Sequence, residues 1–362
     1  MSSVSLRALN RATLARQLLL ERAKIAAVKA VEQLGGMQAQ LARPPYIGLW
    51  SRVADFEREQ LTKAAMKRQL VRATTMRGTL HLLSAKDYVA WRSTFQPMFD
   101  RVTLDNAAEK MANIDIQRLV ADARRFFPCT FDTLRKQLVE LHPGWDDRAM
   151  GLIVRMYLPL VQVPSADMPW GWHGTADFEV AETWLGKPVT KAAALSALAQ
   201  RFLAAFGPAT AADFQTWSGL TGGKEIFEKL RPKLNTFRDP KGRELFDLPK
   251  APRPREETNA PVRFLPDYDN LLLAHADRSR VIPDEYRGRI TPSKNLRVLP
   301  VFLVDGFVAG TWDVEAKKGT ATLLLHPFAP VPKLYKREVE EEADRLIRFI
   351  EEGAERVSVR WQ

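Results

Sequence analysis

The chain has 362 residues, of which 46% are hydrophobic and 27% charged, a balance that favours folded domains over disorder. The 54 lysines and arginines exceed the 43 acidic residues and give a net charge of +11, as in many nucleic-acid-binding proteins, although a merely soluble basic protein would also show it. The single cysteine, Cys129, excludes a disulfide framework and a thiolate metal site. The N-terminus lacks the apolar core of a signal peptide, and no apolar run approaches the ~20 residues of a membrane span. We therefore expect a cytoplasmic protein that does not contact membranes.

The first predicted helices end in a short turn that carries two glutamines. Gly35 and Gly36 stop a helix, and Gln38 and Gln40 follow with one residue between them. Arg43 then precedes two prolines, and a residue before proline favours extended conformations. The pattern predicts a non-helical turn that holds two uncharged amides.

The next elements complete a first unit, residues 1–110. A helix is predicted with Asp55 as its N-cap, followed by strands over 70–75 and 79–83 with Arg77 and Gly78 between them. Three helices followed by a hairpin is the element order of a winged helix. Ser84 begins a linking helix.

Two further units repeat this order. In residues 111–188, helices are predicted near 116–127, 131–141 and 150–157, with strands over 160–163 and 177–184. In residues 189–250, helices are predicted near 191–206, after Thr210 and after Thr221, and a turn separates strands over 235–238 and 243–248. The sequence itself has no period, so the repetition is one of element order alone.

A proline-rich linker over 250–261 separates these units from a region of different character, residues 262–362. Strands are predicted over 296–304, 307–315 and 320–326, joined by tight turns in an antiparallel meander, and a helix over 336–352 follows. The predicted fold class is α+β.

The usual catalytic and metal-binding signatures are incomplete. The stretch 219–224 resembles a phosphate loop but is one residue short, and Glu225 replaces the hydroxyl that would bind magnesium. Asp267 and Asp269 begin like a calcium loop that lacks its third acid and its central glycine. His275 and Asp277 have no third ligand at a suitable spacing. We expect neither a metal nor another cofactor.

Six short motifs along the chain carry a resemblance to a known family. They are Gly-Gly-Met-Gln-Ala-Gln at 35–40, Met-Arg-Gly-Thr-Leu-His at 76–81, Gly-Pro-Ala-Thr at 207–210, Leu-Pro-Asp-Tyr-Asp at 265–269, His-Ala-Asp-Arg-Ser-Arg at 275–280 and Gly-Thr-Trp at 310–312. In this order the chain resembles the winged-helix DNA glycosylases that give bacteria resistance to azinomycin-type products, enzymes that unhook interstrand crosslinks and excise bulky N7-alkylpurines. Gln38 and Gln40 correspond to the Gln-x-Gln branch.

The resemblance implies a fold and a pair of catalytic residues. The fold would be three tandem winged helices and a C-terminal antiparallel β-barrel-like region, forming a C-shaped clamp that binds double-stranded DNA as a monomer. Gln38 and Gln40 would be catalytic. The alternative for both amides is that they only cap helix ends, and the alternative function is a non-catalytic winged-helix regulator or a protein that senses the damaging compound.

Chemistry makes neutral amides plausible catalysts for one class of lesion. A purine alkylated at N7 is cationic and already a good leaving group, so no general acid is needed, while the sugar develops oxocarbenium character. Amide oxygens can position a water and stabilise spreading positive charge. We predict that Gln40 holds the water and that Gln38 orients it or contacts the DNA backbone. No lysine adjoins the glutamines in sequence, so we predict a monofunctional enzyme, and bulky crosslinks favour an open surface over a deep aromatic slot.

Two groups of basic and polar residues are predicted DNA contacts. The first group adjoins the glutamine turn and the first hairpin: Arg43, Arg72, Arg77, Thr79 and His81. The second is a predicted phosphate-binding patch: His275, Arg278 and Arg280. The alternatives are a structural hydrogen-bond cluster around His81 and an internal ion pair between the second group and Asp277.

Overall fold

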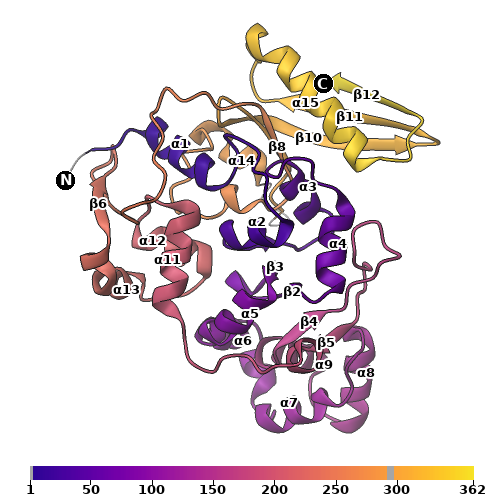
Figure 1. Ribbon diagram of the computed structural model, residues 1–362. Helices are drawn as coiled ribbons and strands as arrows, with labels where there is room; N and C mark the ends of the chain where they lie inside the picture. Colours follow the sequence, from indigo (N-terminus) through magenta and orange to yellow (C-terminus); the bar gives the residue numbers. More distant parts are fainter. Residues whose placement is uncertain (1–2, 292–296) are drawn as a thin grey trace.

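The computed structural model describes residues 3–291 and 297–362. It is a mixed α+β molecule in which the three helix–hairpin units come first and a sheet with one long helix follows (Figure 1). Within the described residues, no helix is both long and apolar enough to cross a bilayer.

The first unit follows the predicted order with one change at the glutamine turn. Its elements are α1 (Leu6–Arg16), α2 (Ala27–Gln33), β1 (Met37–Gln38), α3 (Pro44–Trp50), α4 (Arg58–Met66), β2 (Leu70–Thr74), β3 (Leu80–Ser84), and the linking helices α5 (Ala85–Trp91) and α6 (Gln96–Met111). Gly35 and Gly36 both have positive φ, which explains why α2 stops there.

Two local predictions in this unit are wrong. Arg43 is helical, with φ −67° and ψ −43°, and α3 begins immediately after it, because prolines are well tolerated in the first turn of a helix. Asp55 does not cap α4; the residue before that helix is Glu57, and Asp55 has a φ of 53°.

The second and third units also consist of three helices and a hairpin. The second contains α7 (Ile116–Arg124), α8 (Phe131–Leu141), α9 (Asp147–Tyr157), β4 (Leu160–Gln162), β5 (Phe178–Val180) and the short α10 (Ala181–Leu185), which replaces the end of the predicted strand. The third contains α11 (Leu195–Phe206), α12 (Ala211–Ser218), α13 (Gly223–Leu230), β6 (Asn235–Arg238) and β7 (Glu244–Asp247). Thr210 and Asp213 form a capping box at the start of α12.

The hairpins of the first two units belong to one sheet. Its strand order is β1-β3-β2-β4-β5, and β2 pairs with β4 at Arg72 and Gln162. The third hairpin, β6 and β7, forms a separate two-stranded sheet. Pairing between β2 and β4 therefore joins the first two units in a single sheet.

The C-terminal region corrects the prediction of a β-barrel-like region. It contains β8 (Arg263–Leu265), α14 (Arg287–Ile290), β9 (Val301–Val304), β10 (Phe307–Lys317), β11 (Thr320–Pro327), α15 (Lys333–Ile350) and β12 (Arg356–Trp361). The sheet order is β12-β11-β10-β9-β8, so within the described residues the sheet is open, with β12 and β8 at its edges. β12 runs parallel to β11, which the predicted meander did not include. The predicted start of the strand at Leu296 lies outside the described residues.

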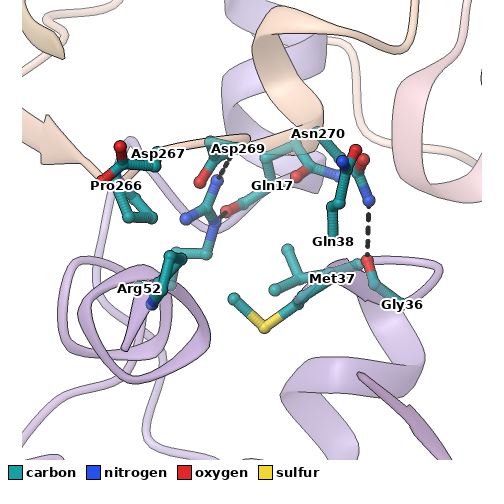
Figure 2. A pocket seen from close by; sticks show the side chains of 11 residues that line it. Gln17, Gly36, Met37, Gln38, Arg52, Pro266, Asp267, Asp269 and Asn270 are labelled. Atoms are coloured by element: carbon teal, nitrogen blue, oxygen red, sulfur yellow. Dashed lines mark hydrogen bonds and ion pairs between the residues drawn. The ribbon is translucent and has the colours of Figure 1, made fainter. Parts of the chain in front are cut away.

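The turn after α2 lies against a distant segment of the C-terminal region. Asn270 donates from its side chain to the carbonyl of Gly36 at 3.2 Å, and Arg52 forms an ion pair with Asp269 at 2.8 Å (Figure 2). Gly48 of α3 packs beside Met37, since a Cβ at this position would meet the end of the Met37 side chain at 2.5 Å. Asp269 and Asn270 thus contact the first unit on both sides of the glutamine turn, at Arg52 and Gly36.

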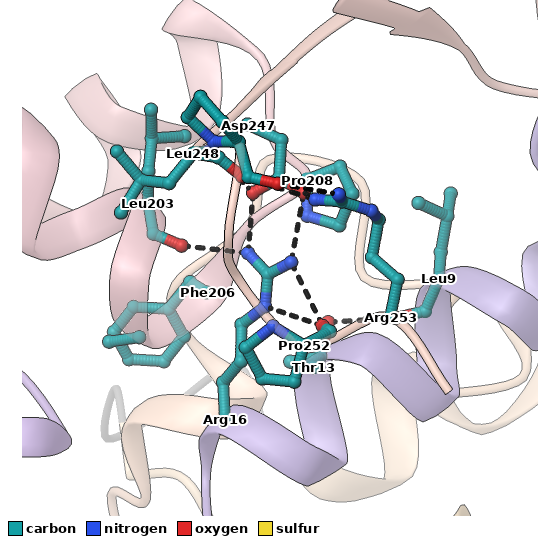
Figure 3. Close-up of polar contacts among 12 residues, drawn as sticks. Leu9, Thr13, Arg16, Leu203, Phe206, Pro208, Asp247, Leu248, Pro252 and Arg253 are labelled. Carbon is teal, nitrogen blue, oxygen red and sulfur yellow. Dashed lines mark hydrogen bonds and ion pairs between the residues drawn. The ribbon is translucent and has the colours of Figure 1, made fainter. Parts of the chain in front are cut away.

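A buried ion pair joins α1 to the third unit. The guanidinium of Arg16 donates to both carboxylate oxygens of Asp247, at 2.7 and 2.9 Å, and to the carbonyl of Leu203 at 2.9 Å (Figure 3). Arg253 from the linker also pairs with Asp247, and neither Arg16 nor Asp247 has an exposed side chain. One carboxylate therefore compensates two cations at the contact of three segments.

Replacement of Asp247 by alanine should lower the free energy of unfolding by roughly 3–5 kcal/mol, because it leaves the buried Arg16 without a counter-charge. Chemical denaturation measures the change. The matched control is Asp344→Ala, which removes the exposed pair with Arg348 and should change stability by no more than about 0.5 kcal/mol. Equal effects of the two substitutions would contradict the role of the buried pair.

Candidate functional site

The glutamine turn extends from the edge strand of the first sheet. Strand β1 pairs with β3, so that Gln38 lies opposite His81, and the N–H of Ala39 donates to the carbonyl of Leu80 at 2.8 Å. Residues 40–43 then cross to the start of α3. The backbone before the turn is fixed by strand pairing and the backbone after it by a helix.

Arg72 stabilises this turn from inside the protein. Its Nε donates to the carbonyl of Ala39 at 2.8 Å and its Nη2 to the carbonyl of Gln40 at 3.1 Å. Burial lowers the pKa of Arg72 to about 10, so it remains charged at neutral pH. Arg72 is buried and hydrogen-bonded to protein, which corrects its prediction as a DNA contact.

Arg77 links Gln38 to two distant parts of the chain. Its Nη2 donates to Oε1 of Gln38 at 2.7 Å and to Oδ1 of Asn270 at 3.0 Å, and its Nη1 donates to the carbonyl of Trp217. Burial, followed by repulsion from Arg278, lowers the pKa of Arg77 to about 10. The guanidinium is therefore a charged junction whose acceptors are all neutral.

His81 is a neutral member of the same cluster. Its ring is fully buried, Nδ1 lies 3.1 Å from the carbonyl of Thr79, and Nε2 lies 3.3 Å from Nη2 of Arg77. Burial and the adjacent Arg77 hold the pKa of His81 well below its usual value. Since arginine can only donate, Nε2 accepts and Nδ1–H donates to Thr79. His81 is thus a structural hydrogen-bonding residue, which was the alternative interpretation, and its predicted DNA contact is corrected.

The two glutamines differ sharply in exposure. Gln38 is 8% exposed and its oxygen accepts from Arg77, whereas Gln40 is exposed. The only polar contact of the Gln40 side chain within the described residues is a long one, 3.4 Å from the N–H of Leu80. The amide of Gln40 is therefore available to solvent. Thr79 and Arg43, both half-buried, lie on the two flanking segments.

A small cavity adjoins Gln38. Its volume is about 10 Å³, room for roughly one water molecule, and its lining is polar on one side (Figure 2). The residues that line it are Gln17, Leu34, Gly36, Met37, Gln38, Pro44, Arg52, Pro266, Asp267, Asp269 and Asn270. None is aromatic, and the space is too small for a nucleobase.

The second predicted group divides into one accessible and two internal residues. His275 is buried with Nε2 3.0 Å from the carbonyl of Phe206, and burial lowers its pKa to about 3. Arg280 is buried and donates to the carbonyl of Pro208 at 2.9 Å. Both predictions of DNA contact are therefore corrected, because these groups bind protein acceptors inside the molecule. Arg278 is half-buried.

The predicted alternative for this group was an internal ion pair with Asp277. Asp277 instead pairs with Lys241 at 2.6 Å and Arg243 at 2.8 Å. Arg278 forms no ion pair with the residues that the structure describes, and burial followed by repulsion from Arg287 lowers its pKa. Arg77 and Arg287 are both close enough to Arg278 for their charges to repel it.

Comparison with known proteins identifies the family. A family model described as "DNA glycosylase AlkZ-like" matches residues 31–349. The chain belongs to the AlkZ-like DNA glycosylase family. A relative from Streptomyces sahachiroi, named "Interstrand DNA cross-link repair glycosylase", is 27% identical over 377 residues, covering 95% of this chain and 96% of the relative. The solved structure of the Streptomyces sahachiroi DNA glycosylase AlkZ has the same fold, with a TM-score of 0.81, 21% identity and full coverage of both chains.

Membership of the AlkZ-like family makes the chain a hydrolase of N-glycosyl bonds. Sequence reasoning missed several residues of the cluster around the glutamine turn. Asn270 and Trp217 contact Arg77 from far along the chain, and no local pattern indicates either contact. The motif at 265–269 ends one residue before Asn270 and was the nearest available signal. Among the described residues, no group of three or more potential metal ligands occurs.

Two of the buried histidines of this glycosylase, His81 and His275, predict a pH dependence of stability. Their pKa values are lowered in the folded state, so between pH 6.5 and 5 the unfolded chain binds protons that the folded chain does not. The free energy of unfolding should fall as the pH is lowered through this range, by up to about 1.4 kcal/mol per pH unit for each histidine. Urea denaturation at a series of pH values measures the slope.

His275→Gln keeps a donor for Phe206 but removes the titrating ring, so the slope should decrease. Replacement of the exposed His173 by glutamine is the control and should leave the slope unchanged. An unchanged slope in His275→Gln would show that this ring takes up its proton over the same pH range in the folded and the unfolded chain.

Proposed function

We propose that this chain is a monofunctional DNA glycosylase that hydrolyses the N-glycosidic bond of N7-alkylated purines and unhooks interstrand crosslinks. Family membership supplies the reaction class. The observation that carries the rest is the exposed amide of Gln40 on a turn whose backbone is fixed by Arg72, beside Gln38. The name of the Streptomyces relative supports the extension to crosslinks.

The two amides have different roles in this proposal. A guanidinium has no acceptor, so the oxygen of Gln38 must face Arg77, and its NH₂ group is left to donate to a water or to a DNA phosphate. The oxygen of Gln40 makes only the long contact with Leu80 and is free to accept a hydrogen bond from the attacking water. Gln40 therefore positions the water, and Gln38 orients the water or the DNA backbone.

The lesion class follows from the low basicity of the two amides. A neutral amide does not generate hydroxide as a strong base would, so the leaving group must already be activated. An N7-alkylpurine is cationic before the bond breaks, and an unmodified purine is not. The oxygen of Gln40 stabilises the oxocarbenium-like sugar through the amide dipole, and selectivity for damaged bases results.

The wider fold is proposed to surround duplex DNA as a monomer. The three helix–hairpin units act as winged helices over residues 1–110, 111–188 and 189–250, and with residues 262–362 they form a C-shaped clamp. The residues that contact the DNA are Arg43, Thr79 and Arg278. Arg77, which contacts Gln38 inside the protein, contributes positive electrostatic potential. The exposed Arg287, which also pairs with Asp284 at 3.9 Å, lies near Arg278. The alternative of a non-catalytic regulator has less support, because the family consists of glycosylases.

Gln40→Ala should reduce the single-turnover rate of base release from DNA containing N7-methylguanine by roughly 100-fold or more, since the variant cannot hold the water. DNA affinity should remain close to that of the wild type. Gln117→Ala, which removes an exposed glutamine from α7, is the control and should leave both quantities unchanged. A parallel loss of rate and affinity would assign Gln40 to binding, and no release by the wild type from any N7-alkyl substrate would remove the proposed reaction.

DNA affinity should fall steeply with salt, because phosphate contacts release counterions. Each neutralised phosphate contributes a slope of about −0.9 in a plot of log affinity against log salt concentration. Arg278→Gln should make the slope shallower by about one such unit, whereas Arg337→Gln, on the exposed face of α15, should not. A flat salt dependence would contradict the clamp.

A further inference from the structure

An exposed leucine lies in the glutamine turn, between Gln40 and the start of α3. Leu41 directly follows Gln40 and is 47% exposed. In the part of the chain that the structure describes, the other exposed large apolar side chains all lie on helices: Leu6, Met66, Leu104, Val139, Leu141 and Leu334. Single apolar residues on a protein surface are common. Among the described residues, Leu41 is distinguished by lying outside the helices, on the turn that carries Gln40.

The base beneath Leu41 is rigid. Ala39 is fully buried and paired with Leu80, and the buried Arg72 donates to the carbonyls of both Ala39 and Gln40. On the other side, α3 starts with the buried Pro44. A side chain that projects from such a base keeps its position when another surface presses on it.

We propose that Leu41 enters the base stack of the duplex beside the damaged nucleotide and is a positioning residue for hydrolysis. Apolar side chains that insert between base steps unstack them and bend the duplex, and the leucine gains burial in return. This inference rests on the proposed function, because Gln40 is the adjacent residue. Insertion of Leu41 would bring the amide of Gln40 to the glycosidic bond.

The same inference accounts for the open site. The cavity at Gln38 has a volume of about 10 Å³ and cannot take a flipped base. Access to the sugar must then come from distortion of the duplex against the protein surface, which an inserted side chain provides. A bulky adduct or a crosslinked base can stay outside the protein throughout.

The test compares Leu41→Ala, Leu41→Met and the control Leu334→Ala, which removes an exposed leucine from the start of α15. Single-turnover base release is measured with saturating enzyme on duplexes containing N7-methylguanine. Leu41→Ala should be slower by about tenfold or more, because it cannot unstack the flanking base. Leu41→Met keeps an apolar side chain of similar length and should retain most of the rate, and Leu334→Ala should match the wild type.

A second duplex separates insertion from a merely structural role. When the lesion stands opposite an abasic site, the stack is already loosened, so the rate of Leu41→Ala should return towards that of the wild type. A 2-aminopurine beside the lesion should brighten when the wild type binds and stay dim with Leu41→Ala. Wild-type rates for Leu41→Ala on the paired lesion, or an equal loss on both duplexes, would overturn the inference. Brightening without base release by the wild type would instead contradict the proposed reaction and leave the insertion standing.

Discussion

The guanidinium of Arg77 is the contact on which the rest of the site depends. It joins Gln38 of the turn, the end of α12 through Trp217, and the C-terminal segment through Asn270. Taking an arginine out of water is costly, and here neutral acceptors rather than a carboxylate compensate for it. The positive charge therefore persists beneath the turn, where it favours a polyanion and disfavours a cation in contact with Gln38.

The charge of Arg77 makes the surroundings of the two glutamines different. Gln38 turns its oxygen towards Arg77 and so presents the positive end of its amide dipole on the other side, which suits a phosphate or the oxygen of a water. Gln40, one residue beyond the buried Ala39, has no charged partner, and its oxygen makes only the long contact with the N–H of Leu80. Two identical side chains are thereby left with different available groups, the NH₂ of Gln38 and the oxygen of Gln40, by their surroundings alone.

Local chemistry was enough to predict most elements of the fold. Gly35 and Gly36 end α2, Thr210 begins α12, and the turn before Arg243 closes the third hairpin, because each of these signals acts within a few residues. Apart from the local errors at Arg43 and Asp55, the predictions failed where a partner lies far away in sequence. The parallel strand β12, the shared sheet of the first two units and the burial of His275 and Arg280 depend on contacts that no local pattern contains. Likewise, the sequence pointed to Gln38 and Gln40 but not to the difference between them, which Arg77 creates.

The pairing of β2 with β4 has a consequence for how this protein can be dissected. A fragment that ends near residue 110 would lose β4, and the edge of β2 would then carry unpaired N–H and C=O groups beneath the residues that support the turn. Such an edge recruits other strands, so the fragment would self-associate. The glutamine turn can consequently not be transferred to another protein by itself. A chimera that carries it must also carry the hairpin of β4 and β5, and evolution would have to exchange the two together.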